Sequence, residues 1–329
     1  MILIVRVVLF MVSENTTQDK MKNAQALFEQ GHAYENGNGC EKDLRRAAEL
    51  YVEAAKCGNI QACILFYFDM DLKNHLHVSR DRFEVILNAA KLGWTAAQFS
   101  IGARFRSGLD CKKDYKAAFY WFEKASKNGH AEATYYLGAM YRRGRAVDAD
   151  EGLADLLTRA AADMGCAPAM HMIGKKALSG DKPTAEAIKW MVLAAKKGYR
   201  AAIYDLANIY LDGSYVEADA LMGLEYLKRA AGMELASAAY QLGTIYENGL
   251  YGIDKNPTEA IRWYNKAADL DYVGAKLRLA EIYEAGVIVD RNLKKSLHYY
   301  NEVDRYGWHY VRERINYIRT DLSRIPVTG

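Results

Sequence analysis

Residues 133–144 read ATYYLGAMYRRG and residues 260–268 read AIRWYNKAA. In both stretches, small and large apolar residues recur at spacings of three and four, which places them on one face of a helix. The first stretch ends at Gly144, and glycine readily takes the left-handed conformation that ends helices. The stretches therefore predict two kinds of helix, one with a small residue at its centre and one with an aromatic pair.

Both stretches return along the chain. The Ala-Ala pair that ends the second one recurs in short segments that are 35, 36, 36, 33, 36, 37 and 36 residues apart. A period in this range is typical of stacked helical repeats, each of which packs on its neighbours. We count eight repeats, which start near Ala24, Gln61, Thr95, Ala131, Ala167, Arg200, Leu235 and Val273.

A residue that can cap a helix precedes the second stretch in most repeats: Asp43, Asp114, Asp219, Asn256 and Asn292. Asn256 is followed by proline and, three residues on, by Glu259, which is a specific signal for a helix start. Each repeat is thus predicted to be an antiparallel helix pair. Examples are expected at 23–35 with 44–56, 133–142 with 153–163, and 239–247 with 258–269. Tryptophans that share one repeat position are predicted to be buried between layers: Trp121, Trp190 and Trp263.

The combined pattern resembles the Sel-one-like repeat (SLR) family, a branch of the tetratricopeptide-like (TPR-like) solenoids. The resemblance covers residues 22–308 and implies an all-α fold, a right-handed superhelical α-solenoid of about eight SLR/TPR-like repeats. It is weakest in the second repeat, where Tyr67 and Lys73 stand in place of the two glycines. Residues 309–329 lack the signature, so we expect a capping helix and a tail there.

Residues 1–21 are expected to form an N-terminal tail. Their apolar run, residues 1–12, is too short to span a bilayer as a helix. It is interpreted as a disordered segment, a start artefact or an atypical export signal. The five cysteines follow no regular spacing, which favours a reducing compartment. A cytoplasmic location is therefore favoured, with a periplasmic or secreted one if the apolar run is an export signal.

Motifs for catalysis are not found: there is no phosphate-binding glycine loop, zinc-ligand spacing or nucleophile elbow. We therefore expect no enzyme activity, no cofactor and no metal. The nearest metal candidate combines Cys63, Asp69, Asp71, His75 and His77, and is interpreted as a polar loop in the irregular repeat. The net charge of +3 is too small to argue for nucleic acid.

Because the resemblance is to TPR-like folds, the first helix of each pair is expected to line the concave face. The exposed positions of this helix would lie three residues before, one residue after and four residues after its central small residue. The row three before reads Phe28, Ile64, Phe99, Tyr135, His171, Tyr204, Tyr240 and Leu277. The row four after reads Glu35, Asp71, Arg106, Arg142, Leu178, Leu211, Glu247 and Glu284. This second row is therefore acidic in the first and last repeats and basic in the middle repeats.

These rows give the predicted partner-binding residues: Phe99, Arg106, Tyr135, Arg142, His171, Lys175, Tyr204 and Tyr240. Aromatic residues and arginine dominate binding energy at interfaces, and arginine pairs well with carboxylates. In the alternative interpretation, the aromatic side chains simply pack on neighbouring repeats.

The resemblance implies a non-enzymatic scaffold or adaptor for a protein or peptide partner. We expect the protein to be a monomer, and the arginines indicate an acidic segment of the partner as their ligand. The alternative is a bacterial immunity or inhibitor protein that neutralises a cognate toxin or effector, or a host-interaction factor.

Overall fold

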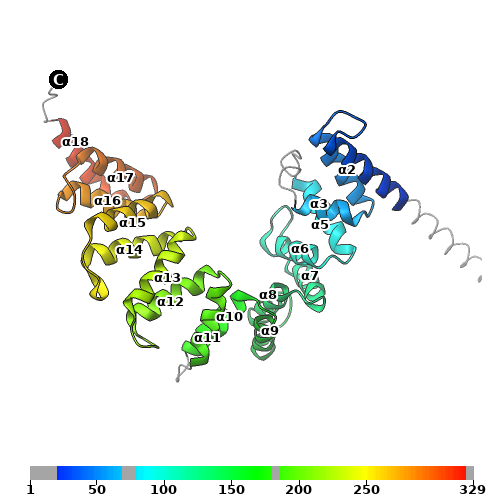
Figure 1. Cartoon of the computed structure of the whole chain (residues 1–329), viewed down its shortest axis with the longest axis horizontal. Helices are drawn as coiled ribbons and strands as arrows, with labels where there is room; N and C mark the ends of the chain where they lie inside the picture. Colours follow the sequence, from blue (N-terminus) through cyan, green and yellow to red (C-terminus); the bar gives the residue numbers. More distant parts are fainter. Residues whose placement is uncertain (1–20, 69–78, 180–184, 324–329) are drawn as a thin grey trace, which may run out of the picture. The chain divides into compact units, whose positions relative to one another are not determined.

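The computed structural model describes residues 21–68, 79–179 and 185–323, and within these ranges it contains helices and turns but no strand. The chain divides into two compact units, Met1–Ala169 and Met170–Gly329 (Figure 1). The all-α fold predicted from the repeat is confirmed. Whether residues 22–308 form one continuous solenoid stays a prediction.

The first unit contains a helix at residues 21–36, followed by α2 (Leu44–Lys56), α3 (Ile60–Phe68), α5 (Ser79–Lys91), α6 (Thr95–Ser107), α7 (Tyr115–Lys127), α8 (Ala131–Arg142) and α9 (Glu151–Asp163). Helices α6 and α7 pack as a pair, as do α8 and α9, and α7 packs on α8 in the next layer. The boundary between the units lies in the first turn of α10 (Ala167–Leu178).

The second unit continues with α11 (Ala185–Lys196), α12 (Arg200–Asp212), α13 (Ala220–Gly232), α14 (Ala236–Asn248), α15 (Pro257–Asp269), α16 (Val273–Ala285), α17 (Leu293–Arg305) and α18 (Arg312–Ser323). Two short 3-10 turns, η1 (Leu250–Gly252) and η2 (His309–Val311), precede α15 and α18. The pairs are α12 with α13, α14 with α15, and α16 with α17. The predicted helix pairs agree with these bounds to within three residues.

In several repeats, the glycine at the centre of the first helix allows an aromatic ring to lie against the backbone. A Cβ added to Gly102 would lie 2.7 Å from Cδ1 of Phe122, and one added to Gly243 would lie 2.6 Å from Cδ1 of Tyr264. Both distances are shorter than van der Waals contact allows. The close approach predicted from the recurring glycine is therefore present in these pairs.

The predicted caps are present. The Asp114 carboxylate accepts hydrogen bonds from the backbone N–H groups of Lys116 and Ala117 at 2.8 and 3.0 Å, and Asn256 accepts one from Glu259 N–H at 3.1 Å. Glu259 does not complete a capping box, because its carboxylate instead accepts the indole N–H of Trp263 at 2.9 Å.

The prediction of buried tryptophans is correct for Trp121 and Trp263, which are 7% and 8% exposed. It is wrong for Trp190, which is only half-buried. The Trp190 indole N–H donates to Glu186 one turn earlier, at 3.1 Å, so it bonds along the surface of its own helix.

After the last repeat the chain forms η2 and α18. Ile315 and Ile318 of α18 are buried with Tyr300 and Val303 of α17 in one apolar cluster. This helix therefore covers the last core layer, as repeat arrays require. Within the described ranges no helix is both long and apolar enough to cross a membrane.

Candidate protein-binding site

In three repeats, the glutamate four residues after the central small residue of the first helix accepts a hydrogen bond from a tyrosine of the second helix. The Tyr264 hydroxyl donates to Glu247 at 2.6 Å, and the Tyr300 hydroxyl donates to Glu284 at 2.9 Å. The same bond joins Tyr51 to Glu35 at 2.6 Å in the first unit. Glu35, Glu247 and Glu284 of the predicted row are therefore bonded within their own repeats, and Asp71 lies outside the described residues.

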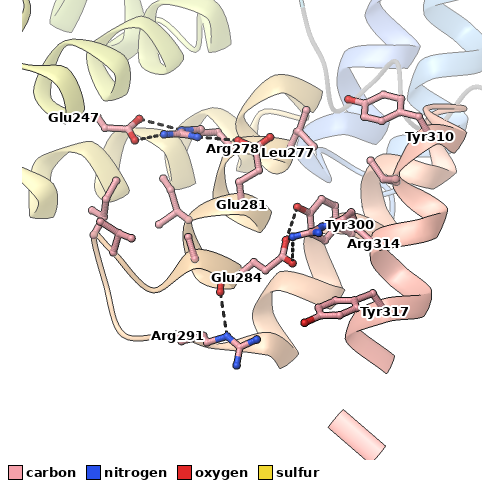
Figure 2. A pocket seen from close by; sticks show the side chains of 15 residues that line it. Glu247, Leu277, Arg278, Glu281, Glu284, Arg291, Tyr300, Tyr310, Arg314 and Tyr317 are labelled. Carbon is pink, nitrogen blue, oxygen red and sulfur yellow. Dashed lines mark hydrogen bonds and ion pairs between the residues drawn. The ribbon is translucent and has the colours of Figure 1, made fainter. Parts of the chain in front are cut away.

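In the second unit, an arginine from the next layer completes each of these pairs. Arg278 on α16 donates through Nε to Glu247 at 3.1 Å and through Nη1 to Glu281 at 2.8 Å. Arg314 on α18 donates through Nε to Glu284 at 3.3 Å. Figure 2 shows both arginines directed at their carboxylates. The ion pairs thus join successive layers of helices.

These contacts shift the ionisation of the groups involved. Burial raises the pKa of Glu247, but the hydrogen bonds from Arg278 and Tyr264 outweigh it and hold the net pKa below the usual value. Burial, followed by the hydrogen bond to Glu247, raises the pKa of the Tyr264 hydroxyl. Glu247 is therefore a charged carboxylate at neutral pH, with its oxygens already bonded.

Side chains of α14, α16, α17, η2 and α18, with the loop after α16, line an open cavity of about 830 Å³, here called the C-terminal hollow. Its polar base consists of the bonded side chains of Glu247, Arg278, Glu281, Glu284, Arg314 and Tyr300. Its rim carries Val287, Tyr310 and Tyr317, which are 86%, 65% and 55% exposed. Figure 2 shows Tyr310 and Tyr317 on the side of η2 and α18, away from Glu247. The hollow combines paired charges with exposed apolar and aromatic surface.

The first-helix positions predicted to face a partner do line this hollow in the last repeat. They are Leu277, Glu281 and Glu284, which lie three before, one after and four after Ala280. Sequence reasoning missed the rest of the site, because Tyr310, Arg314 and Tyr317 belong to the segment interpreted only as a cap. A usable signal was that Arg278 and Arg314 follow their glutamates by 31 and 30 residues.

A smaller cavity of about 310 Å³ involves the predicted residue Lys175. His171 Nε2 lies 2.8 Å from the Asp205 carboxylate, and Lys175 Nζ lies 3.7 Å from it. The His171 hydrogen bond, more than the Lys175 charge, lowers the pKa of Asp205. The structure thus brings these two predicted residues together on one carboxylate.

The predicted aromatic residues of the first unit lie among other rings. Phe99 stacks on His130, with ring centroids 4.4 Å apart, and also contacts Tyr136. Tyr135 contacts Tyr136 edge-on at 5.5 Å. The guanidinium of Arg106 lies over the Tyr136 ring at 4.4 Å.

Arg142 and the aromatic residues of the second unit also have internal contacts. Arg142 Nη2 donates to Asp155 at 2.9 Å and to Thr158 at 3.3 Å. Tyr240 lies 5.5 Å from Tyr264 and 5.0 Å from Tyr272, measured between ring centroids. Tyr204 is half-buried. The ring contacts agree with packing between repeats, and a binding role for these residues stays a prediction.

The metal candidate lies mostly outside the described residues, which omit Asp69, Asp71, His75 and His77. Cys63 is buried, and that burial raises the pKa of its thiol to about 11. Among the residues that the structure describes, no three His, Cys, Asp or Glu side chains are grouped in a way that could hold a metal ion.

The chain matches the family model of the Sel1 repeat at seven places: residues 24–59, 95–130, 131–166, 158–199, 200–233, 236–272 and 273–302. The matches leave out residues 60–94, which correspond to the irregular second repeat.

Curated proteins from fungi and bacteria are similar in sequence. Chitin synthase regulatory factor 3 of Schizosaccharomyces pombe is 32% identical over 200 residues, which is 58% of this chain and 22% of that protein. An uncharacterized protein of Neisseria meningitidis serogroup B is 28% identical over 280 residues, 82% of this chain and 58% of that protein. The chain thus spans less than two thirds of the length of these relatives.

Two solved structures are similar in fold. A Sel1 repeat protein from Oxalobacter formigenes superposes with a TM-score of 0.60 and 26% identity, over 79% of this chain and 99% of that one. A protective antigen of uropathogenic Escherichia coli with an SLR fold gives a TM-score of 0.61 and 24% identity, over 94% and 67% of the two chains. With repeat matches over more than half of its length, the chain belongs to the Sel1 repeat family.

Proposed function

We propose that this chain is a non-enzymatic scaffold that binds a segment of a partner protein in the C-terminal hollow. Sel1 repeat proteins are scaffolds for protein interactions. The observation that carries the proposal is the composition of the hollow, where a base of bonded charges is bordered by exposed Val287, Tyr310 and Tyr317. Tyrosine and arginine are the residue types that contribute most to binding at interfaces.

The paired charges favour binding over chemistry. Glu247 and Glu284 already accept hydrogen bonds from a tyrosine and an arginine each, so neither is poised to take a proton from a substrate. A rigid polar base also loses little conformational freedom when a ligand binds, which favours affinity. The name of a relative, chitin synthase regulatory factor 3, describes a regulator of an enzyme, which also supports a non-catalytic role.

Four aromatic residues of the predicted rows are proposed as secondary contacts, with Phe99 and Tyr135 in the first unit and Tyr204 and Tyr240 in the second. Each of these side chains keeps part of its surface exposed. Because their rings contact neighbours, we expect them to add apolar area rather than to insert into a partner.

The test compares two variants in affinity capture from cells of the source organism, followed by titration calorimetry with the captured partner. Tyr310→Ala/Tyr317→Ala removes two exposed rings from the hollow and should weaken binding by at least about 2 kcal/mol, as interface hot-spot residues do. The matched control is Tyr120→Ala, which removes a 47% exposed tyrosine of α7 far from the hollow in sequence. If the double variant keeps every partner with unchanged affinity while remaining helical, the hollow is not the binding site.

A further inference from the structure

Positive charge gathers around one tyrosine in the first unit. Tyr115, the first residue of α7, has the Lys113 ammonium 5.2 Å from its ring centroid and the Arg145 guanidinium 4.9 Å from it. Lys113 precedes α7, and Arg145 follows α8. Two successive repeats therefore supply the cations.

A third cation, Arg106, acts on the same tyrosine. The hydrogen bond of Lys113 and then the charges of Arg145, Lys113 and Arg106 lower the pKa of the Tyr115 hydroxyl. Arg106 lies over Tyr136, and its buried Nε has no hydrogen-bond partner among the described residues. We call Arg106, Lys113 and Arg145 with Tyr115 the cation cluster.

The cations of this cluster lack the acidic partners that neighbouring arginines have. Arg104 pairs with Asp110 at 3.6 Å and Arg142 with Asp155 at 2.9 Å. In the part of the chain that the structure describes, none of Arg106, Lys113 and Arg145 forms an ion pair with a carboxylate. The cluster thus presents positive charge that the described residues leave without a carboxylate partner.

In the second unit, a similar pair of cations beside an aromatic ring does have an acidic partner. Arg262 and Lys266 flank the Trp263 ring at 5.5 and 5.4 Å. There, Glu259 accepts the indole N–H at 2.9 Å and pairs with Arg262 at 3.2 Å. The Tyr115 cluster has the cations and the ring, but within the described ranges it has no counterpart of Glu259.

We propose that the cation cluster binds an acidic segment of a partner protein, with carboxylates that occupy the place that Glu259 takes at Trp263. Lysine and arginine donate charge-assisted hydrogen bonds to carboxylates, and the Tyr115 hydroxyl is a further donor. The inference rests on the scaffold role proposed above. Its surface, however, belongs to the first unit and carries cations without carboxylate partners among the described residues, whereas the charges of the hollow in the second unit are paired. The sequence predicted that an acidic segment binds Arg106 and Arg142. Because Arg142 is paired with Asp155, we now assign that segment to Arg106, Lys113 and Arg145.

The experiment measures fluorescence anisotropy of a short labelled poly-glutamate peptide with the full chain at low ionic strength. Lys113→Ser/Arg145→Ser should weaken binding about tenfold or more, because complementary charges are lost. Arg262→Ser/Lys266→Ser removes the same charge beside Trp263 and should leave affinity unchanged. Tyr310→Ala/Tyr317→Ala should also leave it unchanged, which separates this site from the hollow. Lys113→Arg/Arg145→Lys keeps the charges and should retain binding.

Two further arms decide between ligands. A poly-glutamine peptide should not bind, and binding of poly-glutamate should weaken as salt rises, because charges are screened over about 8 Å at physiological ionic strength. The proposal would be overturned if Lys113→Ser/Arg145→Ser and Arg262→Ser/Lys266→Ser lost the same amount of peptide affinity. Binding would then depend only on the net charge of the protein. The proposal would also be overturned if an oligothymidylate bound through the cluster while poly-glutamate did not, because the partner would then be a nucleic acid.

Discussion

At the scale of single residues, the contact between a glycine and a tyrosine ring sets the distance between the two helices of a repeat. Gly243 lies under Tyr264, and the ring edge leaves no room for a Cβ. The hydroxyl of the same tyrosine bonds to Glu247 one turn further along α14. One side chain thereby packs the pair and positions a carboxylate at the hollow.

Substitution of Gly243 by alanine should therefore destabilise the protein. The added Cβ would lie 2.6 Å from the Tyr264 ring, and overpacking of this kind costs about 1–3 kcal/mol. Gly232→Ala is the control, because its added Cβ meets nothing within 4 Å and alanine favours helix by roughly 0.5–1 kcal/mol. Urea denaturation followed by circular dichroism measures both. If the two variants were equally stable, the close contact between Gly243 and the Tyr264 ring would not affect the stability of the protein.

At the scale of helices, the ion pair between Glu247 and Arg278 joins α14 to α16. The folded chain holds the pKa of Glu247 below the reference value of 4.5. This group therefore stabilises the folded state at pH values above 4.5, and the contribution disappears as the pH falls through the lower folded pKa.

Glu247→Gln should accordingly lower the free energy of unfolding at neutral pH by about 1.5–3 kcal/mol, the usual contribution of hydrogen bonds to charged groups. The difference from the parent protein should shrink as the pH is lowered below 4.5. Glu217→Gln, at an exposed position with no ion pair in the described part of the chain, is the matched control and should show little difference at any pH. A pH-independent loss would indicate that packing rather than charge is affected.

At the scale of the whole molecule, stability should be local because each repeat packs on its neighbours. Trp121 is buried in the first unit, and Trp121→Ala should cost about 3–5 kcal/mol there, as large core truncations do. Trp190→Ala should cost less, because Trp190 is half-buried.

Hydrogen exchange followed by mass spectrometry tests this locality. In Trp121→Ala, amides of α6, α7 and α8 should exchange faster, while those of α14 to α17 should keep their protection. Loss of protection throughout the chain would mean that the array unfolds as one cooperative block, against the nearest-neighbour description.

The sequence by itself determined the repeat, the helix pairs, the caps such as Asp114, and the glycine positions where helices approach closely. These features depend on residues close together in the chain, so spacing and residue type suffice to predict them. The tertiary structure alone decided which side chains are free to bind. In the sequence, Glu247 and Arg142 were equally plausible binding residues, yet both are bonded to residues on other helices. Lys113 and Arg145, by contrast, have no carboxylate partner in the part of the chain that the structure describes. Such pairing depends on how successive layers bring distant side chains within a few ångströms, and a one-dimensional pattern does not contain that distance.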